Sequence, residues 1–167
     1  MVHIKYGGVH MTRSTPPTPT PLSMHRSEED LPFVPLFDGI QVQLLHADIE
    51  AGLWVTRMRA EPGVTVQKHK HTGEVFAFTI AGSWRYLEYP EINTAGSYLY
   101  EPAASEHTLQ VLADNSGITD VWFAIRGANL NLDANGQVES VLDAGAILEM
   151  YLEGCRRAGY RAPTVIR

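Results

Sequence analysis

The chain lacks the features that mark secreted, membrane-bound or nucleic-acid-binding proteins. Cys155 is its only cysteine, which excludes an intrachain disulfide and fits a reducing compartment. No apolar run approaches the roughly 20 residues that span a bilayer, and the N-terminus lacks the apolar core of a signal peptide. Its 13 basic residues are scattered and outnumbered by 19 acidic ones, which argues against a nucleic-acid surface. We therefore expect a cytoplasmic protein that binds neither membranes nor nucleic acid.

The length and the distribution of turn residues predict one domain between two different ends. A chain of 167 residues can bury one hydrophobic core but is short for two. Residues 1–30 include the run STPPTPTP at 14–21, which favours extended conformations, so we predict a flexible segment there. Short apolar runs separated by Gly and Pro turns fill residues 31–142, a pattern typical of an antiparallel sandwich or barrel. Residues 143–167 are predicted to form a helix and tail, with Asp143 as N-cap and Gly159 just beyond the helix.

Two tight hairpins are predicted within the strand-rich region. Ala81-Gly82 lies between the apolar runs 74–80 and 83–88, and Asn135-Gly136 lies between 130–132 and 138–141. Residues 53–59 alternate, which places Trp54, Thr56 and Met58 on one face and the residues between them on the other.

Two histidines one residue apart carry most of the information about function. In a strand, His69 and His71 project from the same face, with Cα atoms about 6.6 Å apart. Both imidazoles can then reach one metal ion. His107 on a neighbouring strand would complete a three-nitrogen facial site and leave positions for a substrate or O₂.

Glu74 is the carboxylate that the sequence places just after these histidines. It is separated from His71 by two residues and is open to three roles: fourth ligand, acceptor for an imidazole N–H, or surface carboxylate. We favour three histidines without a carboxylate. Such a centre keeps a charge of +2 and favours an anionic, chelating substrate.

If the metal lies inside the barrel, some of the aromatic side chains must line its cavity. The expected pocket residues are Phe76, Phe78, Tyr98 and Tyr100, although alternation alone does not decide which face of their strands points inward. An arginine inside the barrel could pair a bound enolate or carboxylate, and the candidates are Arg57, Arg59 and Arg85.

The spacing of these residues resembles the two motifs of the cupin superfamily. Gly63, five residues, His69-x-His71, Glu74 and Gly82 resemble the first motif, although the family usually has three or four residues before the glutamate. Gly96, Pro102 and His107 resemble the second motif, with Ala104 in place of a glycine. The resemblance implies an all-β fold, with a single cupin (jelly-roll) barrel over about residues 35–130 followed by the C-terminal helix.

Longer segments resemble the 2,4′-dihydroxyacetophenone dioxygenase-like branch of the cupins, namely residues 69–76, 82–89, 100–102, 106–109 and 151–155. This resemblance implies non-haem Fe(II), with Zn or Ni as alternatives, and O₂-dependent cleavage of an aliphatic C–C bond in an aromatic α-hydroxyketone to two carboxylic acids. The alternatives are a non-enzymatic zinc-binding sensor module and a diketone-cleaving metal cupin. Small metal cupins commonly associate through sheet edges or terminal segments, so we expect a homodimer or larger homo-oligomer.

Overall fold

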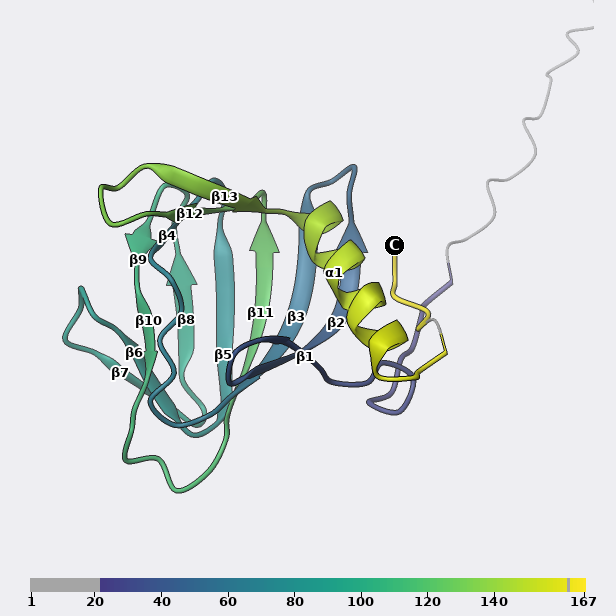
Figure 1. The fold of residues 1–167 in the computed structure, drawn as a ribbon, viewed down its shortest axis with the longest axis horizontal. Coiled ribbons are helices and arrows are strands. Elements are labelled where there is room, and N and C mark those ends of the chain that lie inside the picture. Colours follow the sequence, from purple (N-terminus) through teal and green to yellow (C-terminus); the bar gives the residue numbers. More distant parts are fainter. Residues whose placement is uncertain (1–21, 162) are drawn as a thin grey trace, which may run out of the picture.

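The computed structural model describes residues 22–161 and 163–167, which form a β-barrel with a helix packed against one side (Figure 1). Residues 1–21, including the proline-rich run, lie outside the described part. The elements in chain order are β1 (Val34–Phe37), β2 (Ile40–Asp48), β3 (Leu53–Ala60), β4 (His69–His71), β5 (Val75–Ala81), β6 (Ser83–Tyr86), β7 (Ile92–Thr94), β8 (Tyr98–Glu101), β9 (Glu106–His107), β10 (Leu109–Val111), β11 (Thr119–Arg126), β12 (Asn129–Leu132), β13 (Val138–Leu142) and α1 (Ala144–Arg157).

The strands form three antiparallel sheets that together enclose the core. The largest has six strands in the order β1-β2-β3-β11-β5-β8. A three-stranded sheet has the order β10-β6-β7, and a four-stranded sheet has the order β13-β12-β4-β9. Neighbours far apart in sequence, such as β3 with β11 and β4 with β12, are typical of a jelly roll. The predicted all-β barrel with a C-terminal helix is confirmed.

The alternation predicted for residues 53–59 is confirmed and defines the two faces of the large sheet. Trp54, Thr56 and Met58 of β3 are buried toward the barrel interior, whereas the residues between them are only partly buried. On β11, Val121, Phe123 and Ile125 are also buried. A pleated strand sends successive side chains to opposite faces, so these two central strands supply one wall of the core.

The hairpin predicted at Ala81-Gly82 is wrong. β5 pairs with β11 and β8, whereas β6 pairs with β10 and β7, so the chain changes sheet at this point. Gly82 has a φ of 75°, and a Cβ there would collide with Thr119. Only glycine adopts this backbone at low cost, and the turn therefore redirects β6 away from β5 instead of folding it back.

The second predicted hairpin and the helix ends are confirmed. β12 and β13 pair across Asn135-Gly136, and Gly136 has a φ of 77°. The Asp143 carboxylate accepts a hydrogen bond of 2.8 Å from the backbone N–H of Ala146, as an N-cap does. Gly159 follows the helix with a φ of 77°. Within the described residues, no helix is both long and apolar enough to cross a membrane.

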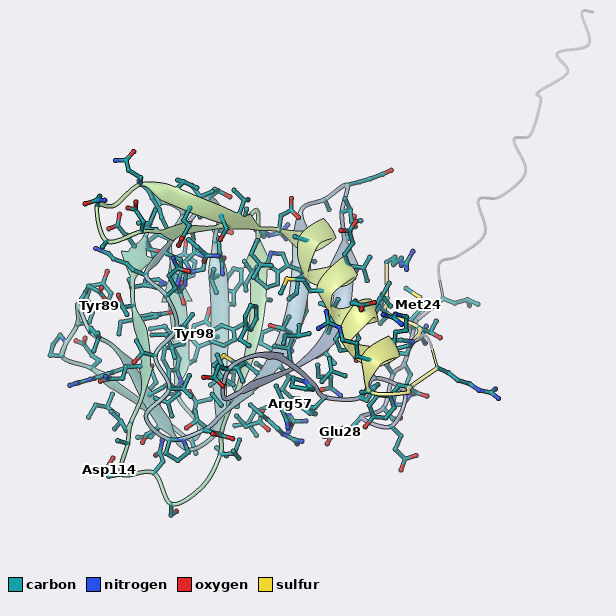
Figure 2. All side chains as sticks on the ribbon, in the orientation of Figure 1. Met24, Glu28, Arg57, Tyr89, Tyr98 and Asp114 are labelled. Carbon is teal, nitrogen blue, oxygen red and sulfur yellow. The ribbon has the colours of Figure 1, made fainter. Side chains whose placement is uncertain are left out.

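One half of the outer face of the large sheet is covered by the segment that precedes β1. Leu31 is fully buried, and its carbonyl accepts a 2.6 Å hydrogen bond from the Gln43 amide of β2. Arg57 contacts Glu28 at 2.8 Å, and in Figure 2 this pair lies toward the α1 side of the sheet. The Arg59 guanidinium lies 3.8 Å from the centre of the Phe33 ring. Glu28 belongs to the segment 1–30 predicted to be flexible, and it therefore has a defined contact with β3.

Candidate metal centre

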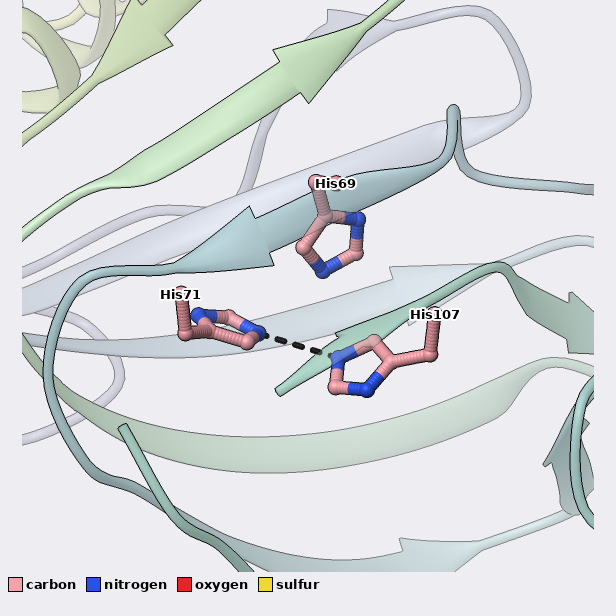
Figure 3. A group of neighbouring side chains, drawn as sticks. All are labelled: His69, His71 and His107. Carbon is pink, nitrogen blue, oxygen red and sulfur yellow. Dashed lines mark hydrogen bonds between the residues drawn. The ribbon is translucent and has the colours of Figure 1, made fainter. Parts of the chain in front are cut away.

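The three predicted histidines come together on adjacent short strands. β4 carries His69 and His71, and its antiparallel pairing with β9 sets His69 opposite His107. All three side chains are buried and project to the same side, as Figure 3 shows. Lys70 lies between the two β4 histidines and faces away, while Lys68 contacts Glu106 at 2.8 Å on the outside. The period of two along β4 is thus what gathers the imidazoles on one face.

The distances between the rings fit a shared divalent ion. Their ligand nitrogens all lie within 4.8 Å of one another, and Nε2 of His71 is 3.1 Å from Nε2 of His107. Two imidazole nitrogens that bind one ion at about 2.1 Å are separated by about 3.0 Å at a right angle and about 3.4 Å at a tetrahedral angle. The observed separation falls between these values.

The hydrogen bond of His69 leaves the correct nitrogen free to bind a metal. Its Nδ1 lies 2.8 Å from the carbonyl oxygen of Gln67. A carbonyl can only accept, so Nδ1 carries the proton and Nε2 keeps its lone pair. Metal-binding histidines are commonly held by such a bond to a backbone carbonyl. Burial lowers the pKa of His69 to about 4, which keeps the ring neutral at neutral pH.

A carboxylate that sequence reasoning did not select also reaches this cluster. Oε2 of Glu101, the last residue of β8, lies 2.9 Å from Nε2 of His71 and 3.1 Å from Nε2 of His107. Despite these distances, Oε2 has no aligned hydrogen-bond donor among the described residues. The two ring nitrogens form a hydrogen bond only with each other, and together with this unpartnered carboxylate oxygen they form a donor set that suits a cation. The expectation of three histidines without an adjacent carboxylate therefore needs correction.

The environment of Glu101 keeps it ionised. Burial alone would raise the pKa of this carboxyl group, but the imidazoles of His107 and His71 outweigh it and lower the pKa to about 2. Its other oxygen, Oε1, accepts a 2.5 Å hydrogen bond from the hydroxyl of Tyr86. Burial and the neighbouring carboxylate raise the pKa of Tyr86 well above its usual value, so the phenol stays protonated and donates. The Tyr86 ring also stacks on His107, with centroids 3.7 Å apart.

Two of the three histidines, His69 and His71, line a mostly apolar cavity of about 470 Å³. His69, His71 and Glu101 contribute polar atoms to its wall, and Ile147 and Met150 of α1 contribute to it from the helix side. Among the described residues that line it, none is a lysine or an arginine. Mostly apolar pockets of this size with a few convergent polar groups are typical small-molecule sites.

The four aromatic side chains expected in the substrate pocket lie outside this cavity. Their inward-facing neighbours are Val75, Ala77 and Thr79 on β5 and Glu101 on β8. The bulky set faces outward because the interior beside β5 is already filled, in part by Trp84, whose indole N–H donates a 2.9 Å bond to the Thr79 hydroxyl. The residues concerned are Phe76, Phe78, Tyr98 and Tyr100.

Glu74 and the arginines are likewise separated from the histidines. Glu74 has the same parity on its strand as the outward residues, and it accepts a 3.1 Å hydrogen bond from the Tyr100 hydroxyl. With only two residues between it and His71, Glu74 therefore lies on the outer face and not at the histidine cluster. Arg57 and Arg59 bind Asp120 on the outer face at 2.7 and 2.9 Å, and Arg85 binds Gln110. An arginine inside the barrel is therefore not observed among the described residues.

Comparison with known proteins places this chain within the cupins. Residues 23–121 match the family of the ChrR cupin-like domain, and the chain belongs to that family. A protein of unknown function with a cupin-like fold from Ralstonia eutropha JMP134 is 35% identical, covering 86% of this chain and 93% of its own, with a TM-score of 0.79. An RmlC-like cupin from the same organism is 28% identical, covering 84% and 92%, with a TM-score of 0.78.

A more distant structure shares the fold. The acetylacetone dioxygenase of Acinetobacter johnsonii is 19% identical over 86% of this chain and 99% of its own, with a TM-score of 0.70. At this identity the likeness shows the fold alone. None of the curated proteins matches the chain.

Proposed function

We propose that this cupin is a metal-dependent dioxygenase that cleaves a C–C bond of a small ketone, with Fe(II) as the working metal. The observation that carries the proposal is the meeting of three buried imidazoles beside a mostly apolar cavity, which two of them line. A divalent iron held by these residues would supply a Lewis-acidic centre where a chelating ketone and O₂ can meet. The fold of an acetylacetone dioxygenase is consistent with this class of reaction.

The cavity lining narrows the class of substrate. A permanently anionic substrate such as a dicarboxylate would need cationic partners beyond the metal, and the described lining offers only Asp38 and Glu101 as charged side chains besides the histidines. The site therefore favours a neutral ketone that loses a proton only on binding. An aromatic α-hydroxyketone such as 2,4′-dihydroxyacetophenone and a β-diketone both meet this condition.

The chain's own residues have definable tasks in such a reaction. The bond from His69 to Gln67 fixes the orientation of that ring, and the Tyr86–Glu101 pair holds a negative charge beside the histidines. Phe123, Ile125 and Leu109 form part of the apolar wall that would orient the organic part of a substrate and exclude water.

A non-catalytic zinc-binding module is the second candidate, and one observation favours it. Glu101 lies close to His71 and His107. Together with all three histidines it would make a set of four donors. Structural zinc sites are closed by four protein ligands, whereas catalytic sites keep a position open. A closed site would leave the cavity beside it without a chemical role.

Oxygen consumption separates these candidates. Protein purified without added metal is analysed for its elements, then loaded with Fe(II) or Zn(II) and offered a panel of 2-hydroxyacetophenones and β-diketones. We expect O₂ uptake only with iron, accompanied by two carboxylic acids from an α-hydroxyketone, and none from His69→Ala. Tightly held zinc with no iron-dependent uptake for any ketone would reject the enzyme and support the zinc module.

A further inference from the structure

The outer face of the large sheet carries an uncovered group of aromatic and aliphatic side chains. Pairing of β11, β5 and β8 sets Trp122 beside Phe78 and Phe78 beside Tyr98 in one row. In the next row Phe76 is paired with Tyr100, and the two rings are 5.6 Å apart. We call this surface the aromatic face, and it consists of Phe76, Phe78, Ile80, Tyr98, Tyr100 and Trp122.

The aromatic face is the half of the outer surface that the chain does not cover itself. Residues 26–33 lie over β2 and β3, where Leu31 is fully buried. No such cover lies over β5 and β8 within the described residues: Phe78 is 45% exposed and Tyr98 63% exposed. Figure 2 shows Tyr98 toward the β8 side of the sheet, away from the Arg57–Glu28 pair. β8 is also the last strand of this sheet, so the face extends to an edge.

We propose that a second copy of this chain packs on the aromatic face, with the same face of each copy meeting across a two-fold axis. The four most exposed side chains of the face present roughly 400 Å² of apolar surface, taking about 200 Å² for each when fully exposed. That is about half of the roughly 800 Å² each partner buries in a standard interface, and a central apolar half inside a polar rim is the usual arrangement. These four residues are Phe78, Ile80, Tyr98 and Tyr100.

Charge and composition favour a second copy over other partners. The chain has a net charge of −6, and like charges would oppose self-association at most of its surface. The aromatic face holds no aspartate, glutamate, histidine, lysine or arginine side chain. Arg57 and Arg59 at its border are already paired with Asp120, so they are poorly placed to recruit an anionic lipid or nucleic acid.

The geometry of the face suits isologous packing. Two pleated sheet faces can pack about 10 Å apart with their strands aligned within about 30°, and a surface that is complementary to itself generates a closed dimer. Tyrosine, tryptophan and phenylalanine are the residues most enriched at interface centres. The charged side chains of Glu74 and Arg126 lie at one end of the same strands and would form part of the rim.

Analytical ultracentrifugation of the full-length chain tests this interface. We expect the wild-type mass to be twice 18.5 kDa, and Phe78→Glu and Tyr98→Glu each to raise the dimer dissociation constant at least about 30-fold, as loss of an interface hot spot does. Val138→Glu, an equally exposed apolar position on β13, is the matched control and should stay dimeric. Circular dichroism confirms folding, and Tyr98→Ser replaces any glutamate variant that unfolds.

Two outcomes would overturn the proposal. One is a wild-type protein that sediments at 18.5 kDa up to roughly 100 µM, a concentration at which a dimer with a micromolar Kd would be fully formed. A monomer that instead binds phosphatidylcholine vesicles through this face counts as the same outcome. The other is a dimer that Phe78→Glu, Tyr98→Glu and Tyr98→Ser leave as tight as Val138→Glu does. Neither outcome bears on the proposed dioxygenase activity, because the face lies outside the cavity.

Discussion

Replacing Glu101 with glutamine isolates the contribution of one negative charge to the metal centre. The variant Glu101→Gln keeps the shape of the side chain and an oxygen that can accept the Tyr86 hydrogen bond. It removes the charge that lies 2.9 Å from His71 Nε2 and 3.1 Å from His107 Nε2. Three neutral imidazoles then hold a divalent ion alone, and the net charge of the centre rises from +1 to +2.

The expected loss can be converted into a thermal shift. Loss of a carboxylate that binds the ion, or that supports its ligands, typically weakens metal affinity by ten- to a hundredfold. A metal present at 100 times its Kd stabilises the folded protein by about 2.7 kcal/mol, which is roughly 5–11 °C for a domain of this size. In Glu101→Gln at the same metal concentration, about 0.4–1.4 kcal/mol remains, or roughly 1–6 °C.

Differential scanning fluorimetry with and without metal, together with chelator competition, measures both quantities. Glu74→Gln is the matched control, because Glu74 is a carboxylate near the same strands that binds Tyr100 instead of the histidines. We expect its metal-induced shift to equal that of the wild type. An unchanged Kd in Glu101→Gln, or an equal loss in Glu74→Gln, would refute the assignment of Glu101 to the centre.

Three further predictions concern the site and the helix. His107→Ala should retain less than about a tenth of the wild-type metal after desalting, as expected when one of the three imidazole ligands is lost; full metal content by elemental analysis would contradict the site. In metal-free protein, the pKa of His69 is about 4 in the folded state against an ordinary 6.5, so the unfolded chain binds the proton more readily. The unfolding free energy should therefore fall by about 3 kcal/mol from pH 6.5 to pH 4. Urea unfolding at a series of pH values measures this fall, and an equal fall in His69→Gln would contradict the prediction. Asp143→Ala removes the N-cap bond to Ala146 and should cost about 1 kcal/mol in denaturant unfolding, whereas Asp143→Asn should cost little.

Local patterns predicted much of the fold but not every pairing of strands. The period-two alternation of β3, the Asn135-Gly136 hairpin and the N-cap of α1 depend on a few adjacent residues and were predicted from them. The turn at Ala81-Gly82 has the same local signature as a hairpin. Its outcome is decided by Thr119, which packs against Gly82 from a distant strand, and by the β10 and β7 partners that β6 finds instead.

The candidate site shows a similar division. His69 and His71 were identifiable because one strand places both on the same face, and His107 followed from a second motif. Glu101 was missed although it lies just before Pro102 in that same motif, and its parity on β8 was the available signal. The expectation that Tyr98 and Tyr100 face the cavity would turn Glu101 to the outer face, because successive residues of a strand face opposite sides. Only the crowding of the interior beside β5 shows that the smaller, carboxylate-bearing set faces inward.

The helix at the end of the chain has a consequence for how this protein could diversify. Ile147 and Met150 of α1, with Val141 and Leu142 of β13, form part of the cavity wall. None of these four belongs to β4, β8 or β9, which carry the polar centre. Substitutions there can reshape the space offered to a guest molecule while the ion-binding groups stay unchanged. Substitutions in the last quarter of the sequence can therefore change substrate selectivity while the metal-binding groups are kept. Homologues with the same histidines but a different terminal helix should accept different substrates.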